Sequence, residues 1–372
     1  MLELKLDDIR YFNSYQQGLY PPAEHAAIIN IARSLVGLHS ARLTTPYITL
    51  FTRNKNFKRN SLREELYENK QLIKMRCMRK TLHIVPFDLA PIVYQATLNL
   101  RTQDWVRLSK QLKNHAKQID RIREIVIEHI RDKPSSSKAI KEVINQKQYP
   151  SHVSSLLPLI IKQLWEEGVI CYINASKDWL HEDRLYGYTS SFYPNLNLFK
   201  YEQTEAEKLL IIKYINTYGP VAQEDISWWA GLGISKVHKL LKEMPKQIIE
   251  VKIMGIEKVF YMTHSSVDYY LSIAKSPCKK WVRLLAYEDP YLKGYFYSRW
   301  RYIDLPYMSR LFNAIGEARA SIMIDGHVAG TWGFLKKTKE IYWETFRKLT
   351  NEELYLLSAE IDEQQQWLND NS

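Results

Sequence analysis

The sequence predicts an α+β fold, and three observations carry this prediction. Runs with helical periodicity alternate three times with pairs of strand-like runs. After Pro277 the pattern changes to aromatic-rich strands that break at Pro and Gly. The chain has 372 residues, which favours several domains over one core. We therefore expect a mixed architecture of small helical and β-containing domains.

The clearest copy of the repeated pattern covers residues 203–263. Thr204 and Glu207 have the spacing of a capping box at the start of a long amphipathic helix, which a Gly-Pro pair ends. Two shorter helices follow in "AQEDISWWAGL" and "SKVHKLLKEM". The run "QIIEVKIMGIEKVFYMT" then alternates around Gly255, as a hairpin does. Three helices followed by a hairpin predict a winged helix.

Two further copies precede this one. Residues 120–190 repeat the plan, with a short helix behind serine caps and two strands at the end. Residues 24–86 fit more loosely, with a helix over 23–38, a strand-like segment over 39–53 and a strongly basic wing. The linking stretch 87–118 is predicted to be helical and basic.

The C-terminal part predicts a small β-barrel-like domain followed by a capped acidic helix. Its strands turn at Asp325-Gly326, a pair typical of tight hairpins. The full expectation is three tandem winged helices (helix-turn-helix domains), the first with a helical extension, then the barrel-like domain and the helix. The expected boundaries are 1–118, 119–200, 201–274, 275–345 and 346–372.

The charge favours a polyanionic partner. The net charge is +11 and the isoelectric point is near 9.2. Between Arg53 and Lys80 there are ten basic residues and three glutamates, a net charge of +7. Nucleic acid is the first expectation and an anionic membrane surface the second, and charge alone leaves RNA open beside DNA.

Cysteine usage and hydropathy indicate a cytoplasmic protein. Cys77, Cys171 and Cys278 are odd in number, far apart and without metal spacing, as reduced thiols are. No apolar run reaches 18 residues, so we expect no membrane span. His181 and Asp183 have no partner at ligand spacing, so we expect no metal and no cofactor. The expected oligomeric state is a monomer.

Four motifs occur in an order that is specific for one family: "MRKTLHIVP" (78–86), "TYGPVAQEDISWWAGL" (217–232), "AYEDPYLKGYFYSR" (286–299) and "MIDGHVAGTW" (323–332). In these motifs the chain resembles the winged-helix crosslink-repair DNA glycosylases of the AlkZ/YcaQ type. The resemblance spans nearly the whole chain from about Leu35. It implies a basic channel for double-stranded DNA and hydrolysis of the N-glycosidic bond of alkylated purines, including interstrand crosslinks.

The resemblance also implies a catalytic Gln-x-Gln or Gln-x-Asp motif after the first long helix, and here that position reads His39-Ser40-Ala41. A purine alkylated at N7 is cationic and leaves without a general acid, so the enzyme mainly positions a water and stabilises an oxocarbenium-like sugar. A neutral imidazole accepts a hydrogen bond from water, so His39 is the catalytic candidate. Ala41 lacks a catalytic side chain. A histidine donating to a carbonyl at a helix end is the alternative for His39.

The remaining candidates follow from charge and motif position. The predicted DNA contacts are Arg42, Arg53, Lys74, Arg76, Arg79 and Lys80. Residues that would support the site are Asp289, Arg299 and Asp325. Asp289 is expected to cap a helix or bind Arg299, Asp325 also suits a plain hairpin turn, and Trp228-Trp229 is expected in the core.

Two functions remain open at this point. The first is a DNA repair glycosylase, a hydrolase acting on alkylation damage. The second is a non-catalytic winged-helix DNA-binding protein, such as a regulator or lesion sensor. The His-Ser-Ala tripeptide is the feature that separates them, and whether the chain is an active enzyme depends on it.

Overall fold

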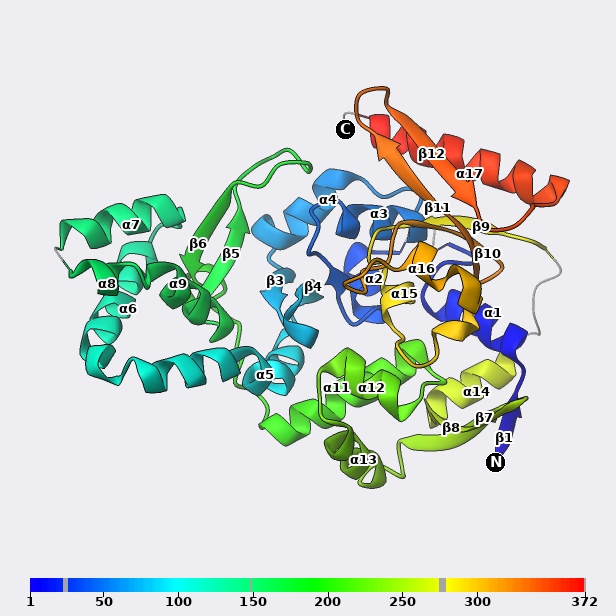
Figure 1. The fold of residues 1–372 in the computed structure, drawn as a ribbon, viewed down its shortest axis with the longest axis horizontal. Helices are drawn as coiled ribbons and strands as arrows, with labels where there is room; N and C mark the ends of the chain where they lie inside the picture. The colour runs from blue at the N-terminus through cyan, green and yellow to red at the C-terminus, as the bar shows by residue number, and fades with distance from the viewer. Residues whose placement is uncertain (23–25, 148, 274–278, 371–372) are drawn as a thin grey trace. The chain divides into compact units, whose positions relative to one another are not determined.

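The structure, a computed structural model, describes most of the chain: residues 1–22, 26–147, 149–273 and 279–370. It divides into two compact units (Figure 1). Unit 1 consists of Met1–Leu62 and Lys208–Ser372, and unit 2 is Arg63–Glu207. Both units mix helices with small sheets, so the expected α+β class is confirmed.

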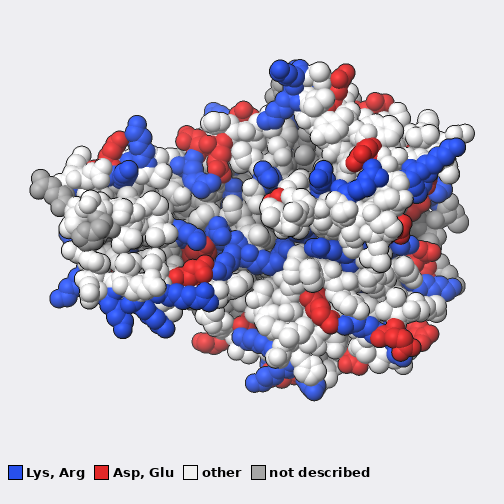
Figure 2. All heavy atoms as spheres, viewed as in Figure 1, with Lys and Arg blue, Asp and Glu red and all other residues white. Residues whose placement is uncertain are grey.

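Lys and Arg side chains form clusters on the molecular surface (Figure 2). On the face drawn in Figure 2, groups of Lys and Arg side chains lie among scattered Asp and Glu side chains. Within the described residues, no helix combines the length and the apolarity that crossing a membrane requires.

Unit 2 contains helices with two hairpins. Its elements after the helix α4 (Arg59–Arg63) are a π-helix (Glu64–Glu68), β3 (Leu72–Arg76), a 3-10 turn (Met78–Lys80), β4 (Leu82–Pro86), α5 (Ala90–Gln111), a 3-10 turn (Lys113–His115), α6 (Ala116–Ile130), α7 (Ser137–Gln146), α8 (Ser151–Ser154), α9 (Leu157–Glu166), β5 (Ile170–Asn174), β6 (Arg184–Tyr188) and α10 (Thr189–Phe192).

In unit 2, the region expected to hold the second repeat contains helices α6, α7, α8 and α9 followed by the hairpin β5–β6. Ser136 accepts a hydrogen bond from the Ala139 backbone N–H and caps α7, as expected from the serine run. Strands β5 and β6 pair antiparallel. Isoleucine side chains from α6, α7 and α9 form the core of this region, including Ile122, Ile140 and Ile160. The helical character expected of the linking stretch is confirmed by α5, and the basic run before it forms the antiparallel pair β3–β4.

Unit 1 is built from both ends of the chain. Its elements are β1 (Leu2–Leu4), α1 (Leu6–Gln16), α2 (Ile28–Ser34), β2 (Leu38–His39), α3 (Thr45–Arg53), α11 (Gln203–Tyr218), α12 (Gln223–Ala230), α13 (Ile234–Lys242), β7 (Ile248–Ile253), β8 (Ile256–Thr263), α14 (His264–Ser272), β9 (Val282–Leu285), α15 (Pro290–Lys293), 3-10 turns at Arg299–Arg301 and Leu305–Tyr307, α16 (Met308–Leu311), β10 (Ser321–Ile324), β11 (His327–Leu335), β12 (Glu340–Thr345) and α17 (Asn351–Asn369).

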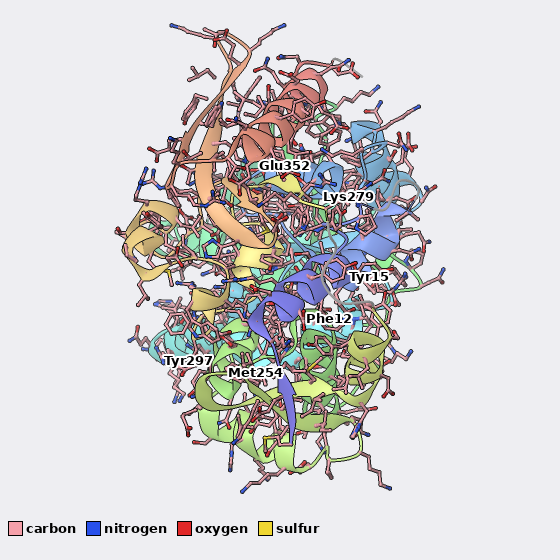
Figure 3. The ribbon with its side chains drawn as sticks, turned by 90° about the vertical axis from the view of Figure 1, so that its right-hand side faces the viewer. Phe12, Tyr15, Met254, Lys279, Tyr297 and Glu352 are labelled. Carbon is pink, nitrogen blue, oxygen red and sulfur yellow. The ribbon has the colours of Figure 1, made fainter. Side chains whose placement is uncertain are left out.

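The N-terminal strand joins the third predicted hairpin. Strand β1 pairs parallel with β7, which pairs antiparallel with β8. Leu4, Ile9 and Phe12 share one hydrophobic core with Phe260 and Met262 of this hairpin. Figure 3 shows α1, with Phe12 labelled, beside the β7–β8 hairpin. The chain's first residues are therefore held by a hairpin that forms far along the sequence.

The third repeat has the expected order of elements, with one local difference. The hairpin turns at Gly255, whose φ of 80° suits glycine. The capping box expected at Thr204 and Glu207 is wrong, because α11 begins at Gln203 and Thr204 lies inside it. The buried Glu207 instead accepts a hydrogen bond from the side chain of Gln203, at 3.1 Å.

The last strands form an open sheet of order β12-β11-β10-β9. Strands β12 and β9 are its edges and do not pair with each other, so the described strands make a sheet and not a closed barrel. The predicted turn at Asp325-Gly326 is confirmed, with φ of 49° and 81°. Helix α17 lies beside this sheet (Figure 1).

The segment 39–53, expected to be strand-like, is mostly helical. Its first residue ends the short strand β2, and the segment then forms α3 from Thr45 to Arg53. Pro46 stands in the first turn of α3, where its fixed φ favours a helix and its missing N–H costs nothing. The β-branched residues that suggested a strand are buried on this helix, since tertiary packing overrides their local preference.

The cap of α17 gives a prediction for acid stability. Thr350 and Glu353 form a capping box, and the hydrogen bond from Arg347 is the main reason that the pKa of Glu353 falls to about 2. A lowered pKa stabilises the fold above the usual glutamate range, and this stabilisation is lost as the pH falls toward 2. Glu353→Gln should therefore lower the free energy of unfolding at pH 7 by about 1 kcal/mol. In urea titrations the gap between wild type and variant should shrink as the pH falls below 4.5, the usual glutamate value. A gap that is independent of pH contradicts the assignment.

Candidate functional site

His39 lies in unit 1 between two helices that fix its position. Helix α2 ends at Ser34, and Val36 and Gly37 then adopt φ of 55° and 105°. A β-branched residue at positive φ is strained, which indicates that the surrounding packing holds this turn. The turn places His39 in the interior, where it is 3% exposed.

Glu288 faces His39. The His39 Nε2 and Glu288 Oε2 atoms are 3.6 Å apart, which is an electrostatic contact longer than a hydrogen bond. Glu288 is 5% exposed, and its Oε1 atom lies 3.1 Å from the Lys293 ammonium. Lys293 also donates to the Gly316 carbonyl at 2.8 Å. One carboxylate thus lies between an imidazole and an ammonium group in a water-poor setting.

Two neighbouring carboxylates point to different partners at this site. Glu288 has a φ of 59°, which turns the chain so that Glu288 contacts His39 while Asp289 contacts Arg53. Positive φ at a residue other than glycine costs free energy and is frequent at functional sites. The strained turn is what allows adjacent acidic residues to serve two separate groups.

Helix α3 is tied to the strand and turn that carry these carboxylates. Thr45 donates to the Tyr287 carbonyl and Thr52 to the Leu284 carbonyl, at 2.8 and 2.9 Å. Because His39 precedes α3 and Glu288 follows β9, these bonds help to fix the distance between the two side chains.

The prediction that Arg53 binds DNA is wrong for this structure. Arg53 is fully buried and donates to both carboxylate oxygens of Asp289, at 2.9 and 2.8 Å. Its guanidinium also donates to the Gln17 and Thr49 carbonyls. A buried, fully bonded guanidinium has no face left for a phosphate. The expected Asp289–Arg299 pair is likewise replaced by Asp289–Arg53, while Asp289 does cap α15 through the Tyr291 N–H.

Of the other two residues of the tripeptide, Ser40 is buried and only Ala41 is exposed. Ser40 is 2% exposed, and its hydroxyl oxygen has no hydrogen-bond partner among the residues that the structure describes. Ala41 is exposed. Arg42 follows with its guanidinium 5.2 Å from the Tyr287 ring centre and 3.9 Å from Glu317, and its side chain is 61% exposed. Exposure therefore rises from the buried His39 and Ser40 to the exposed Ala41 and Arg42.

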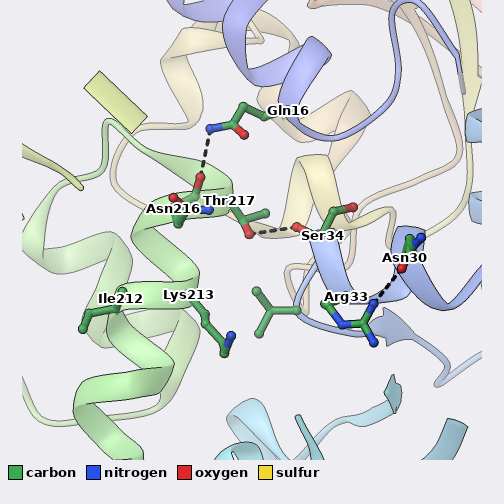
Figure 4. Close-up of a pocket in the computed structure, with 9 residues that line it drawn as sticks. Gln16, Asn30, Arg33, Ser34, Ile212, Lys213, Asn216 and Thr217 are labelled. Carbon is green, nitrogen blue, oxygen red and sulfur yellow. Dashed lines mark hydrogen bonds between the residues drawn. The ribbon is translucent and has the colours of Figure 1, made fainter. Parts of the chain in front are cut away.

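A cleft of about 470 Å³ lies between α2 and α11 (Figure 4). Arg33 and Lys213 line it together with Asn30, Asn216 and Gln16, and its lining contains no acidic residue. Arg33 is anchored by a hydrogen bond to the side chain of Asn30, at 2.6 Å. Two cations beside several amides make this cleft suited to an anion. Sequence reasoning had not selected it, because its residues are dispersed along the chain.

Lys74 in unit 2 is not the surface cation that was predicted. It is 6% exposed, with its ammonium 3.8 Å from Glu182 and 4.3 Å from the Tyr172 ring centre. Burial lowers the pKa of Lys74 to about 8. Its position gives Lys74 a packing role in the hairpin, so the DNA contact expected of it is corrected.

Arg76 is also engaged within unit 2. Its Nε atom lies 2.7 Å from Oε1 of Glu166, a buried carboxylate that Arg101 also approaches. Burial raises the pKa of Glu166, with the two arginines acting against that shift. Because removing Arg76 would leave a buried carboxylate with less compensation, its first role is structural.

Arg79 and Lys80 lie at the tip of the same hairpin and are half-buried, with φ of 51° and 59°. Lys80 pairs with Asp104, at 2.8 Å. In the predicted basic wing, these two residues are partly exposed cations at the hairpin turn.

Arg299 and Asp325 each have partners elsewhere in unit 1. The Arg299 guanidinium lies 4.0 Å from the Phe312 ring centre, and Arg299 donates to the Tyr295 carbonyl. Asp325 accepts a hydrogen bond from the Trp281 N–H at 2.9 Å, so it stabilises its hairpin turn. Of the tryptophan pair, Trp229 is buried as expected, whereas Trp228 is only partly buried.

Sequence reasoning missed Glu288 and Lys293. Both lie in the "AYEDPYLKGYFYSR" motif, in which Asp289 and Arg299 were the predicted residues. The available signal was the adjacent acidic pair, since two carboxylates in a buried motif need two separate cationic partners. Across the described part of the chain, no group of three or more His, Cys, Asp or Glu side chains is placed to hold a metal ion.

Comparisons with known proteins identify the family and the fold. A family model described as DNA glycosylase AlkZ-like matches residues 32–367. Over 134 residues the chain is 29% identical to the Interstrand DNA cross-link repair glycosylase of Streptomyces sahachiroi, which covers 35% of each protein. The solved structure of Streptomyces sahachiroi DNA glycosylase AlkZ matches with a TM-score of 0.80 and 18% identity, over 98% of each chain. That likeness concerns the fold.

Proposed function

Because the chain belongs to the AlkZ-like DNA glycosylase family, we propose that it binds double-stranded DNA and hydrolyses the N-glycosidic bond of purines alkylated at N7. The observation that carries this proposal is the buried contact of His39 with Glu288 at the position of the tripeptide. The name of the Streptomyces sahachiroi relative supports including crosslinked purines among the substrates.

The proposed reaction divides the work between substrate and protein. The N9–C1′ bond breaks, the cationic base takes the bonding electrons and leaves neutral, and the sugar becomes oxocarbenium-like. Water adds to C1′ and its proton passes to the imidazole of His39, which acts as general base. Glu288 stabilises the resulting imidazolium, as a carboxylate does beside a catalytic histidine. The buried Ser40 hydroxyl is the next side chain along the chain and has no hydrogen-bond partner among the described residues.

The same proposal assigns the architecture. The helix–hairpin segments with boundaries 1–118, 119–200 and 201–274 are three winged helices, supported by the hairpins β3–β4, β5–β6 and β7–β8. We place the β domain within 275–345, supported by strands β9 to β12, and the terminal segment within 346–372, supported by α17 (Asn351–Asn369). We take the working protein to be a monomer.

A base-release assay tests the function directly. Purified protein is incubated with duplex DNA that contains N7-methylguanine, and free base and abasic sites are measured. We expect release of the cationic base and little release of neutral lesions, because the site displays no general acid for a neutral leaving group. Tight DNA binding without release would reject catalysis.

A non-catalytic DNA-binding protein of the same fold is the second candidate. The alanine at position 41 favours this second candidate, because its methyl group cannot hydrogen-bond a water at the position where the family has Gln or Asp. This candidate predicts binding to lesion-bearing DNA with no abasic product at any pH.

DNA binding should depend steeply on salt. If Arg33 and Lys213 contact phosphates, Arg33→Gln with Lys213→Gln should weaken binding to all sequences and reduce the slope of log K against log salt by roughly 0.9 per lost contact. Fluorescence anisotropy on an undamaged duplex over a salt series measures this slope.

The matched control removes two charges elsewhere in unit 1. Lys336 and Lys337 are exposed in the turn between β11 and β12. Lys336→Gln with Lys337→Gln should leave the slope close to that of wild type. Equal losses in both double variants would mean that the cleft has no special part in binding.

A further inference from the structure

The loop after α15 presents two aromatic side chains to solvent. Phe296 is 51% exposed and Tyr297 is 42% exposed, and Figure 3 labels Tyr297 near the edge of the drawn ribbon. Single exposed aromatic residues are common on protein surfaces. Two in succession become informative when the backbone that carries them is held in one conformation.

One buried carboxylate holds that backbone. Asp225 of α12 is fully buried, and its Oδ1 atom accepts hydrogen bonds from the backbone N–H groups of Phe296, Tyr297 and Ser298, at 2.8, 2.8 and 3.1 Å. Its Oδ2 atom accepts from the Ser298 hydroxyl, at 2.5 Å. Burying a carboxylate is costly unless it is fully hydrogen-bonded. Here that compensation comes from a loop whose own aromatic side chains stay outside the core.

The exposed rings are part of a larger aromatic and cationic surface. Phe296 stacks on Trp228 with ring centres 5.4 Å apart and planes at 22°. The Arg299 guanidinium lies 5.3 Å from each of these two rings. The Lys258 ammonium lies 4.2 Å from the centre of the Tyr297 ring.

This surface is connected to the candidate site by consecutive contacts. The Lys293 ammonium is 5.4 Å from the centre of the Trp228 ring and 3.1 Å from Glu288, and Glu288 is 3.6 Å from His39. A group bound on the aromatic surface would therefore lie within a few side chains of the imidazole.

We propose that Trp228, Phe296 and Tyr297 form a stacking surface for an unpaired nucleobase of the bound DNA. The inference rests on the proposed DNA binding and deepens it by naming what the site beside His39 recognises. Aromatic faces bind nucleobases by stacking with little regard for sequence, and nearby cations attract the phosphates that flank the base. Inside an intact duplex the neighbouring base pairs cover both faces of each base, so an unpaired base offers these rings a face that an internal paired base does not.

Binding of two undamaged probes tests the proposal without base release. One probe is a duplex with a single bulged 2-aminopurine, and the other is the fully paired duplex of the same length. Phe296→Ala with Tyr297→Ala should weaken binding of the bulged probe by about tenfold and leave the paired probe almost unchanged. Wild-type protein should also quench 2-aminopurine fluorescence through stacking, and the double variant should not.

Two further variants sharpen the comparison. Tyr355 is 75% exposed on α17, so Tyr355→Ala removes a more exposed ring elsewhere and should change binding of neither probe. Phe296→Tyr with Tyr297→Phe keeps both rings and should restore quenching. Thermal unfolding of each variant shows whether the fold is kept.

Each outcome has one meaning. Wild-type binding to neither probe would overturn the proposed DNA-binding function itself. Binding of both probes with equal affinity and no quenching would overturn only the stacking surface. An equal loss of affinity for both probes in the double variant would reject base recognition. It would indicate instead that the two rings contact the duplex in general. Unchanged binding of both probes by the double variant would also reject the stacking surface.

Discussion

Replacing His39 with alanine is expected to abolish base release from DNA carrying N7-methylguanine while DNA affinity stays nearly unchanged. His39 is 3% exposed, so it contributes little to the DNA-binding surface itself. General base catalysis typically contributes roughly 100- to 10,000-fold to a rate, and the loss should fall in that range. Single-turnover release assays and anisotropy on the same preparations separate the two effects. Loss of binding in parallel with release would contradict the assignment.

The pH profile adds a readout that a purely structural role for His39 would not move. Protonated imidazole cannot accept a proton from water, so the wild-type rate should fall as the pH drops through the range in which histidine titrates. In Glu288→Gln the imidazolium loses its neighbouring anion, so the acid limb should move to lower pH and the maximal rate should fall. His264 is exposed at the start of α14, and His264→Ala should leave the profile unchanged.

The degenerate motif can be examined by restoring part of it. Ala41→Gln reintroduces a side chain that the family uses to hold water, so release should become faster if the pocket is otherwise intact. If the wild-type protein releases no base, and the double variant Ala41→Gln with His39→Gln also releases none, the proposed glycosylase activity is rejected. The non-catalytic DNA-binding protein then becomes the better account.

The second large effect concerns stability. Arg53 and Asp289 are both fully buried and joined by two hydrogen bonds, at 2.9 and 2.8 Å. Removing one partner leaves an uncompensated buried charge, so Arg53→Met or Asp289→Ala should lower the free energy of unfolding by about 3–5 kcal/mol. Urea denaturation followed by circular dichroism measures the loss.

The exposed Arg42 provides the matched control. Its side chain is 61% exposed, so Arg42→Met should change stability by less than about 0.5 kcal/mol. A small loss for Arg53→Met, combined with weaker DNA binding, would restore the original expectation that Arg53 contacts phosphate. Replacing both buried partners by apolar residues should cost less than either single change, because no charge is then left alone.

The sequence by itself determined the features that short-range chemistry controls. Gly255 and the Asp325-Gly326 pair mark hairpins because these turns need positive φ. The serine before α7 and the Thr350–Glu353 spacing mark helix starts because those side chains satisfy free backbone N–H groups. The order of four motifs also identified the family, which the match over residues 32–367 confirms.

Only the tertiary structure decided the roles of individual charged residues. Arg53 and Arg42 look alike in a basic sequence, yet one is fully buried against Asp289 and the other is largely exposed. The contact between His39 and Glu288 joins segments far apart in the chain, and no local periodicity reports such a contact. The free energy of a charge depends on its burial and its partner, and both are fixed only when distant elements pack together.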